Sequence, residues 1–365
     1  MHICLLAKKV GPETGGLGRH VTELCNQYVE KGHEVTVLTR ECPNKERTKG
    51  EIVEVPYIDA KVEALNFYTS LKGFYQELKK RKNDFDVIHG HGMDSLSYLM
   101  LKKRIEDLPP LVYTLHGISE KHISRKCLQP VANVLYYPER KVVKNADQLI
   151  AVSKDAKSRS SEHYGVVEEE IEVIYNGVDT EKFRPVNEFD NKILFVGHMV
   201  SRKGPQILLD AFEKLSEDYP FTELNFVGGG RKKEELKKQT REKGLKEQIN
   251  FLENVSDEEL IELYSESVFV LPSEYEGLGI VYLEANACGA PAVGCNLSAV
   301  PEVIDHGETG MLIDRNPKSL EKALRELLSD HKKIKEMGNK GREKAKGFEW
   351  SRIADETLEL YRSIK

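Results

Sequence analysis

The chain has 365 residues, of which 39% are hydrophobic, 8% aromatic and 31% charged, and its formal net charge at pH 7 is −6. This composition is typical of soluble globular domains and excludes a disordered chain, while the length predicts about two domains. No apolar run approaches the roughly 20 residues that a membrane-spanning helix requires, and the small acidic surplus argues against nucleic-acid binding as the main task.

The N-terminal apolar run, residues 3–7, is followed at once by Lys8 and Lys9. We interpret it as a buried strand rather than a signal peptide, and therefore expect a cytoplasmic protein. The six cysteines are scattered, without a CxxC pair or a companion histidine cluster at metal-ligand spacing. They are predicted to be reduced thiols, mostly in the core.

Short β-branched runs alternate with longer amphipathic stretches through the first half of the chain. This alternation predicts βα units that build a parallel sheet, with helices in most of the intervening segments. The predicted strands are residues 2–7, 34–39, 86–89, 111–115, 148–152 and 171–174.

The same alternation restarts in the second half, after a segment (residues 180–191) that contains Pro185 and has no periodic apolar signal. Ser256 and Glu259 form a capping box at the start of one predicted helix. We place a hinge in residues 180–191 and predict an N-terminal domain (1–185), a C-terminal domain (186–346) and a terminal helix (347–365). The predicted strands here are residues 192–196, 223–227, 249–252 and 268–271, with helices at about 204–219 and 231–243.

Glycines follow the first predicted strand in the run GGLGRH, residues 15–20. Such a strand-to-helix turn lets a ligand approach the backbone, although a packing turn would need the same residues. The run is neither a dinucleotide fingerprint, because Val21 occupies the third glycine position, nor a P-loop.

His116 lies just beyond a predicted strand, at the edge where open α/β sheets bind ligands, although nearby backbone could also satisfy it. For His89 and His91, at another strand end, we favour a structural role. The DxD at residues 84–86 stands at the amino end of a strand, away from that edge, so we do not expect it to bind metal.

Two motifs of the second half carry charge at strand-to-helix turns. Arg202 and Lys203 lie in the turn 197–204, where cations can stabilise a departing diphosphate. In the segment 272–289 a glycine turn leads into a predicted helix. The eight-residue spacing of Glu276 and Glu284 predicts that both carboxylates lie on roughly one helix face.

Taken in order, these motifs resemble the retaining glycosyltransferases of family 4, which have the GT-B fold. The resemblance covers nearly the whole chain, through GGLGRH, TLHG, Ser153 at a helix start, NGVD at 176–179, the Lys-Gly turn, VGGG at 227–230 and EGLGIVYLEANACGAPAV. It implies two Rossmann-like, doubly wound parallel-sheet domains that face a central cleft and close over a nucleotide-sugar donor. The terminal helix would cross back to the N-terminal domain.

The resemblance also implies a set of site residues. Lys203 resembles the diphosphate-binding lysine, Arg202 could assist it, and His116 resembles the histidine that contacts the donor sugar. Glu276 resembles the carboxylate that binds sugar hydroxyls, and Glu284 the one that holds the ribose. The remaining donor-binding positions that we predict are Gly16, Gly197, His198, Gly229, Leu278 and Gly279.

Three positions depart from the family pattern. His198 stands where the family usually has arginine, which removes one permanent cation. The usual EGFG is EGLG, residues 276–279, and Glu253 replaces a glycine near the base-binding loop.

The sequence therefore predicts a hexosyltransferase that takes a nucleotide-diphosphate sugar, such as a UDP-sugar, and retains the anomeric configuration through a front-face reaction. No metal or other cofactor is expected. The alternatives are a GT-B epimerase or phosphorylase, a dinucleotide-dependent oxidoreductase, which the glycine spacing disfavours, and a non-catalytic sugar-nucleotide-binding protein.

The acceptor is unidentified, and a glycan, a lipid and a small molecule all remain open. We expect first-domain loops, such as residues 118–130, to recognise it. Basic clusters at 79–82, 102–104 and 121–126 all lie in the first half. They are either solvated helix faces or a peripheral contact with the inner face of a membrane.

Overall fold

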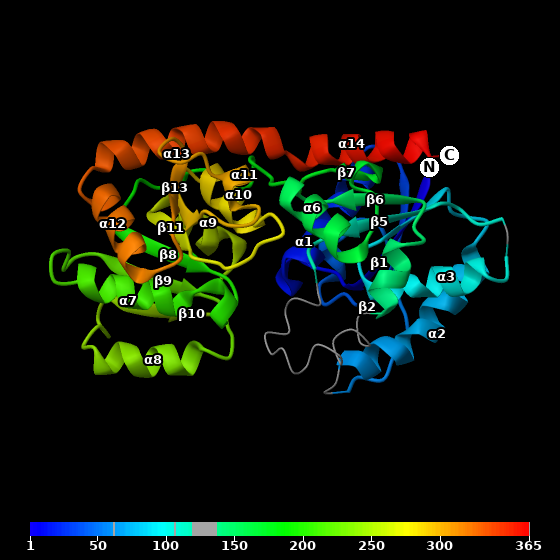
Figure 1. The fold of residues 1–365 in the computed structure, drawn as a ribbon, viewed down its shortest axis with the longest axis horizontal. Helices are drawn as coiled ribbons and strands as arrows, with labels where there is room; N and C mark the ends of the chain where they lie inside the picture. Colours follow the sequence, from blue (N-terminus) through cyan, green and yellow to red (C-terminus); the bar gives the residue numbers. More distant parts are fainter. Residues whose placement is uncertain (61–62, 106, 119–136, 365) are drawn as a thin grey trace. The chain divides into compact units, whose positions relative to one another are not determined.

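Two compact units make up the part of the chain that the computed structural model describes, residues 1–60, 63–105, 107–118 and 137–364. Unit 1 consists of Met1–Asn176 and Trp350–Lys365, and unit 2 of Gly177–Glu349. Each unit contains one parallel sheet with helices packed against it (Figure 1). The predicted α/β class, with two Rossmann-like doubly wound sheets, is confirmed.

In unit 1 the seven strands follow the order β3-β2-β1-β4-β5-β6-β7. The middle strands are continuous buried runs, because helices cover both faces of a doubly wound sheet. The chain order reverses between β1 and β4, and this switch point opens a crevice at the carboxyl ends of the two strands. The strands are β1 (His2–Lys9), β2 (Glu34–Glu41), β3 (Glu51–Glu54), β4 (Val87–Gly90), β5 (Leu111–Leu115), β6 (Gln148–Ala151) and β7 (Ile171–Val173).

The helices of unit 1 begin and end at residues whose local chemistry favours those limits. Ser153 caps α6, since its hydroxyl accepts a hydrogen bond from the Ala156 amide at 3.0 Å, and Gly165 ends that helix in the left-handed conformation. The helices are α1 (Gly16–Glu30), α2 (Glu63–Arg81), α3 (Leu96–Lys102), α5 (Tyr137–Val143), α6 (Lys154–Tyr164) and α14 (Trp350–Ser363).

The terminal helix α14 packs against α1 of unit 1. The Tyr361 hydroxyl lies 3.1 Å from that of Tyr28 and 2.5 Å from Nδ1 of His89, and all three side chains are buried. At the rim, Lys31 forms an ion pair with Asp355 at 2.9 Å. The apolar face of the terminal stretch is thereby removed from water.

In unit 2 the six strands follow the order β10-β9-β8-β11-β12-β13. The chain order reverses at β8, which lies between β9 and β11, so this sheet also has a switch point. The strands are β8 (Lys192–Val196), β9 (Glu223–Val227), β10 (Ile249–Leu252), β11 (Ser267–Leu271), β12 (Ala292–Cys295) and β13 (Gly310–Ile313). The helices are α7 (Pro205–Leu215), α8 (Lys233–Glu242), α9 (Asp257–Ser265), α10 (Ile280–Ala287), α11 (Val300–Val303), α12 (Pro317–Leu328) and α13 (His331–Ala345).

The predicted capping box at the start of α9 is present, because Ser256 and Glu259 each bind the other's backbone N–H. The predicted strands all form, with limits that differ by a residue or two. Three strands were not predicted: β3, β12 and β13. The short edge strand β3 begins and ends with a glutamate, Glu51 and Glu54, so it lacks the apolar pattern that predicts a strand.

In the described residues, no helix is both long enough and apolar enough to cross a membrane. Five cysteines lie there, and each is buried and outside any disulfide bond, so their predicted position in the core is confirmed. Cys127, with the basic cluster 121–126 and most of the loop 118–130, lies outside the described residues.

Candidate functional site

The turn that follows β8 carries four of the predicted site residues. Gly197 has φ +145, and its amide donates to the carbonyl of Val227 at the end of the neighbouring strand β9. His198 is exposed. Arg202 and Lys203 form a short 3-10 turn that ends at Gly204, where a Cβ would lie 2.3 Å from the Pro272 carbonyl oxygen. This close approach fixes both cations beside the segment that follows β11.

Glu276 lies in that segment and meets Lys203 directly. Its Oε1 accepts from Lys203 Nζ at 2.5 Å and from the Ser273 hydroxyl at 2.6 Å. Arg202 Nη1 lies 3.8 Å from the same oxygen and donates to the Tyr275 carbonyl. Because the carboxylate is buried, its charge requires these partners.

The turn before α10 contains the predicted amides of Leu278 and Gly279. Leu278 is buried, and Gly279 caps the helix at φ +90. A Cβ on Gly279 would lie 2.6 Å from the Tyr282 ring, so glycine is needed here for both conformation and space. The first N–H groups of a helix have no acceptor four residues earlier within the helix, so the start of α10 is suited to donate to an anion.

The prediction that Glu276 and Glu284 lie on one helix face is wrong, because it assumed that both residues are helical. The helix α10 begins only at Ile280, so Glu276 belongs to the preceding turn and Glu284 alone is helical. Glu284 is buried, and its Oε2 accepts from the Tyr264 hydroxyl at 3.1 Å. The left-handed Gly279 breaks the helix that the spacing assumed.

Gly229 follows β9, and its carbonyl accepts from the Met199 amide at 2.7 Å. The backbone is close-packed here, since a Cβ on Gly228 would lie 2.6 Å from the Gly197 carbonyl oxygen. Nearby Glu253 forms an ion pair with Lys233 at 2.8 Å, and this lysine holds the pKa of the Glu253 carboxyl below its usual range.

These unit 2 residues follow β8, β9 and β11, which are adjacent strands of one parallel sheet. Their carboxyl ends meet at the switch point, where doubly wound sheets bind ligands. Two cations, a buried carboxylate and a helix start therefore lie at one edge, an arrangement suited to an anionic ligand that also carries hydroxyl groups.

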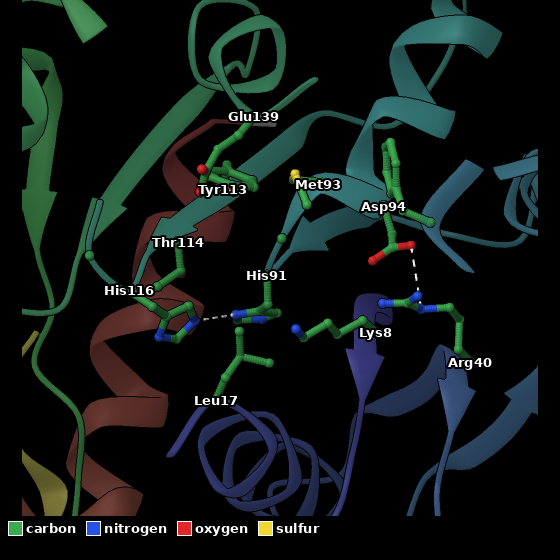
Figure 2. A pocket seen from close by; sticks show the side chains of 13 residues that line it. Lys8, Leu17, Arg40, His91, Met93, Asp94, Tyr113, Thr114, His116 and Glu139 are labelled. Atoms are coloured by element: carbon green, nitrogen blue, oxygen red, sulfur yellow. Dashed lines mark hydrogen bonds and ion pairs between the residues drawn. The ribbon is translucent and has the colours of Figure 1, made fainter. Parts of the chain in front are cut away.

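Unit 1 holds Gly16 and His116. Gly16 is the first residue of α1, and a Cβ built on it would meet no atom within 4 Å. His116 follows β5, and its Nε2 lies 3.1 Å from Nδ1 of His91, which follows β4. Figure 2 shows these two rings facing one another across the rim of a pocket.

That pocket has a volume of about 120 Å³ and lies at the carboxyl edge of the sheet. Lys8 and Arg40 supply positive charge to its lining, and Asp94 and Glu139 supply negative charge (Figure 2). Arg40 Nε lies 3.8 Å from Asp94 Oδ1, and both side chains are almost fully buried. None of these four residues was predicted, because each one looks like an ordinary charged residue in the sequence.

The histidines of unit 1 form a cluster that was also not predicted. His89 fits the structural role expected of it, since its ring nitrogens contact the hydroxyls of Tyr361 and Thr114. His91 instead faces His116 and His20. Burial lowers the pKa of His20 to about 4 and holds the pKa values of His91 and His116 well below the usual range. All three rings are therefore neutral at neutral pH.

Asp86 does not reach the ligand edge. Its carboxylate accepts from the His2 amide at 2.7 Å, at the amino ends of the strands. The predicted position of the DxD segment, at the amino end of its strand, is confirmed.

Two family models match the chain. The model "Glycosyltransferase Family 4" matches residues 14–182, and "Glycosyl transferases group 1" matches residues 179–344. Among curated relatives, a glycogen synthase of Mycobacterium tuberculosis is 28% identical over 96% of this chain and 92% of its own length. A D-inositol 3-phosphate glycosyltransferase of Corynebacterium efficiens is 26% identical over 99% of this chain and 93% of its own.

Solved structures share the fold. A sucrose-phosphate synthase from Thermosynechococcus elongatus superposes with a TM-score of 0.85 at 22% identity, covering 100% of this chain and 98% of that one. Anabaena Alr3699/HepE, solved in complex with UDP and glucose, superposes with a TM-score of 0.80 at 21% identity and covers 100% of both chains.

Proposed function

The chain belongs to glycosyltransferase family 4, and we propose that it moves a hexosyl group from a nucleotide-diphosphate sugar to an acceptor hydroxyl with retention of the anomeric configuration. That the protein is a glycosyltransferase with the GT-B fold follows from the family models and the named relatives. The proposal concerns the donor, the stereochemistry and the residues that act.

The observation that carries the proposal is the contact of Lys203 with Glu276 at the carboxyl edge of the unit 2 sheet. A nucleotide-diphosphate sugar presents a diphosphate beside a sugar rich in hydroxyls. Lys203 and Arg202 would bind the diphosphate, and the Glu276 carboxylate would accept hydrogen bonds from the sugar hydroxyls. A nucleotide-diphosphate sugar would therefore use both the cations and the carboxylate of this contact.

The nucleotide end of the donor would use the other groups at this edge. The amides of Leu278 and Gly279, at the start of α10, would donate to the diphosphate. Glu284 would bind the ribose hydroxyls, with the Tyr264 hydroxyl holding its carboxylate in place. The same edge would be lined by the backbone of Gly197 and Gly229 and by the exposed imidazole of His198. The UDP and UDP-glucose complexes of the Anabaena neighbour support a UDP-sugar.

For the chemical step we propose a front-face reaction. As the bond from the sugar to the diphosphate breaks, the departing diphosphate oxygen takes the proton of the acceptor hydroxyl, which attacks from the same side. Lys203, Arg202 and the start of α10 stabilise the charge that develops on the leaving group. These groups supply the electrostatic help, so we propose that transfer needs no metal.

Unit 1 would supply His116 to contact the donor sugar near the reacting carbon and the Gly16 amide to face the donor phosphate. The open space over Gly16 supports the second role, because neither its conformation nor its neighbours require glycine. The pocket beside His116, with charges of both signs, suits a polar acceptor that carries hydroxyl groups and ionic groups.

We also propose a peripheral membrane contact through unit 1. The helices α2, α3 and α5 expose Tyr68, Met100 and Tyr137 together with basic side chains. A groove of about 520 Å³ runs between α3 and α5, and its rim includes Lys102, Lys103 and Lys141. Exposed aromatic and basic residues together suit the headgroup region of an anionic bilayer.

Donor binding and acceptor-dependent transfer test the proposed function. Unfolding midpoints of the full chain would be measured with UDP-, GDP- and ADP-sugars, and with the matching nucleoside monophosphates as controls. A donor at one hundred times its Kd should add about 2.7 kcal/mol to the free energy of unfolding. No stabilisation by any nucleotide sugar would contradict the proposal. Nucleotide diphosphate released without a glycosylated acceptor would instead favour the alternative, an epimerase or phosphorylase.

A further inference from the structure

Three histidines of unit 1, far apart in the sequence, converge at the switch point of its sheet. His20 lies in the second turn of α1, His91 follows β4 and His116 follows β5. The ring centroids are separated by 5.1 Å for His20 and His91, 4.7 Å for His20 and His116, and 5.4 Å for His91 and His116. Each ring therefore neighbours both of the others.

The spacing of the nitrogens suits one metal ion. One ligand nitrogen from each ring can be chosen so that all three lie within 4.8 Å of one another. Two nitrogens bound to a tetrahedral zinc ion, each at about 2.0–2.1 Å, lie about 3.3–3.4 Å apart. Nδ1 of His91 and Nε2 of His116 are already 3.1 Å apart, so only small side-chain movements would be needed.

The hydrogen bonds of His20 leave its metal-binding atom available. Its Nδ1 lies 2.7 Å from the side-chain oxygen of Asn176, which can only accept, so Nδ1 carries the proton. Nε2 then presents a lone pair, and no described residue donates to it. A histidine held through its other nitrogen by a carbonyl oxygen is the usual arrangement around bound metals.

His91 would bind the ion through Nδ1, and its Nε2, to which no described residue hydrogen-bonds, would carry the ring proton. Nε2 of His20 is buried without a partner among the described residues, and buried polar atoms normally have one. Lys8 and Arg40 in the adjoining pocket are balanced by Asp94 and Glu139, so the pocket lining carries no excess of positive charge that would repel a metal ion.

We propose that His20, His91 and His116 form a three-histidine site for a divalent first-row transition ion of the zinc, cobalt and nickel class. Imidazole nitrogens favour these ions over magnesium or calcium, which take oxygen ligands. Three protein ligands leave a fourth position that a water molecule can fill.

The site has a consequence that rests on the proposed function. An ion that holds His116 withdraws this ring from the donor sugar, so zinc binding should inhibit transfer. Metal binding itself does not depend on the proposed function, and the two can therefore fail separately.

Direct binding measurements test the site. The full chain, stripped with a chelator and dialysed, would be titrated with Zn²⁺ by calorimetry, and bound metal would be counted by elemental analysis. We expect one ion per chain. His20→Gln, His91→Gln and His116→Gln should each weaken binding at least a hundredfold, whereas the control His331→Gln, which changes an exposed histidine of unit 2, should leave it unchanged. Asn176→Leu should weaken it about 10- to 100-fold.

Spectroscopy on the wild-type chain keeps the test valid if a buried variant fails to fold. X-ray absorption at the zinc edge should show three imidazole ligands, and the Co²⁺-loaded chain should show the visible bands of a four-coordinate ion. The proposal is overturned if no stoichiometric ion binds, if bound zinc lacks imidazole ligands, or if folded histidine variants bind as well as the wild type. Binding without inhibition would keep the site and contradict only the role of His116 in transfer.

Discussion

Lys203 Nζ donates to Glu276 Oε1 at 2.5 Å, although 73 residues separate the two in the chain. They meet because β8 and β11 are neighbours in a parallel sheet, so the turns that follow them lie side by side. The pair places a cation and a hydroxyl-binding carboxylate at the switch point of unit 2.

Replacing Lys203 with Ala should lower kcat by about 10²- to 10³-fold, because a cation that stabilises the leaving diphosphate is lost. Ser273 and Arg202 remain near Glu276, so the far-UV circular dichroism spectrum should be unchanged. The control Lys238→Ala, at an exposed lysine of α8, should keep full activity. Near-normal turnover of Lys203→Ala would count against the assignment.

The product should have the same anomeric configuration as the donor, which proton NMR of the reaction can determine. Glu276 is already held by Lys203 and Ser273, so we expect it to bind hydroxyls rather than act as a nucleophile. Glu276→Gln should reduce transfer, and intact-mass spectrometry of the wild-type chain during turnover should find no glycosylated protein. An inverted product, or a glycosyl adduct on Glu276, would refute the front-face proposal.

Two glycines of α1 provide a matched pair. A Cβ on Gly16 would meet no atom within 4 Å, whereas one on Gly18 would lie 1.8 Å from Oγ1 of Thr14. Gly18→Ala should therefore cost about 1–3 kcal/mol of stability, measured by denaturant unfolding. Gly16→Ala should fold normally but raise the KM for the donor about tenfold or more, because its methyl group would obstruct the phosphate. An unchanged KM would remove Gly16 from the donor site.

Vesicle sedimentation can test the membrane contact. The chain should bind vesicles that contain an anionic lipid, bind neutral vesicles weakly, and dissociate as salt is raised. Lys103→Glu combined with Arg104→Glu should weaken binding roughly thirtyfold or more, since each cation contributes about 1 kcal/mol. The control pair Lys238→Glu and Arg241→Glu, on α8 of unit 2, should bind normally. Equal binding of both double variants would contradict a contact through α3.

Local signals allowed much of the fold to be predicted. Ser256 and Glu259 marked the start of α9 because a capping box needs only four consecutive residues. The edge strand β3 was not predicted, because its charged residues give no alternation of apolar and polar positions. The placement of Glu276 on a helix failed for a local reason as well, since Gly279 adopts a left-handed conformation that helical spacing ignores.

The amino-acid sequence by itself determined the alternation of strands and helices, the glycine turns after strands and the family that these motifs resemble, because each depends on neighbouring residues. Tertiary structure alone decided which turns meet. The contact of Lys203 with Glu276 and the convergence of His20, His91 and His116 depend on the lateral order of the strands. That order is set by long-range packing, since a strand can join either side of a growing parallel sheet with the same local conformation.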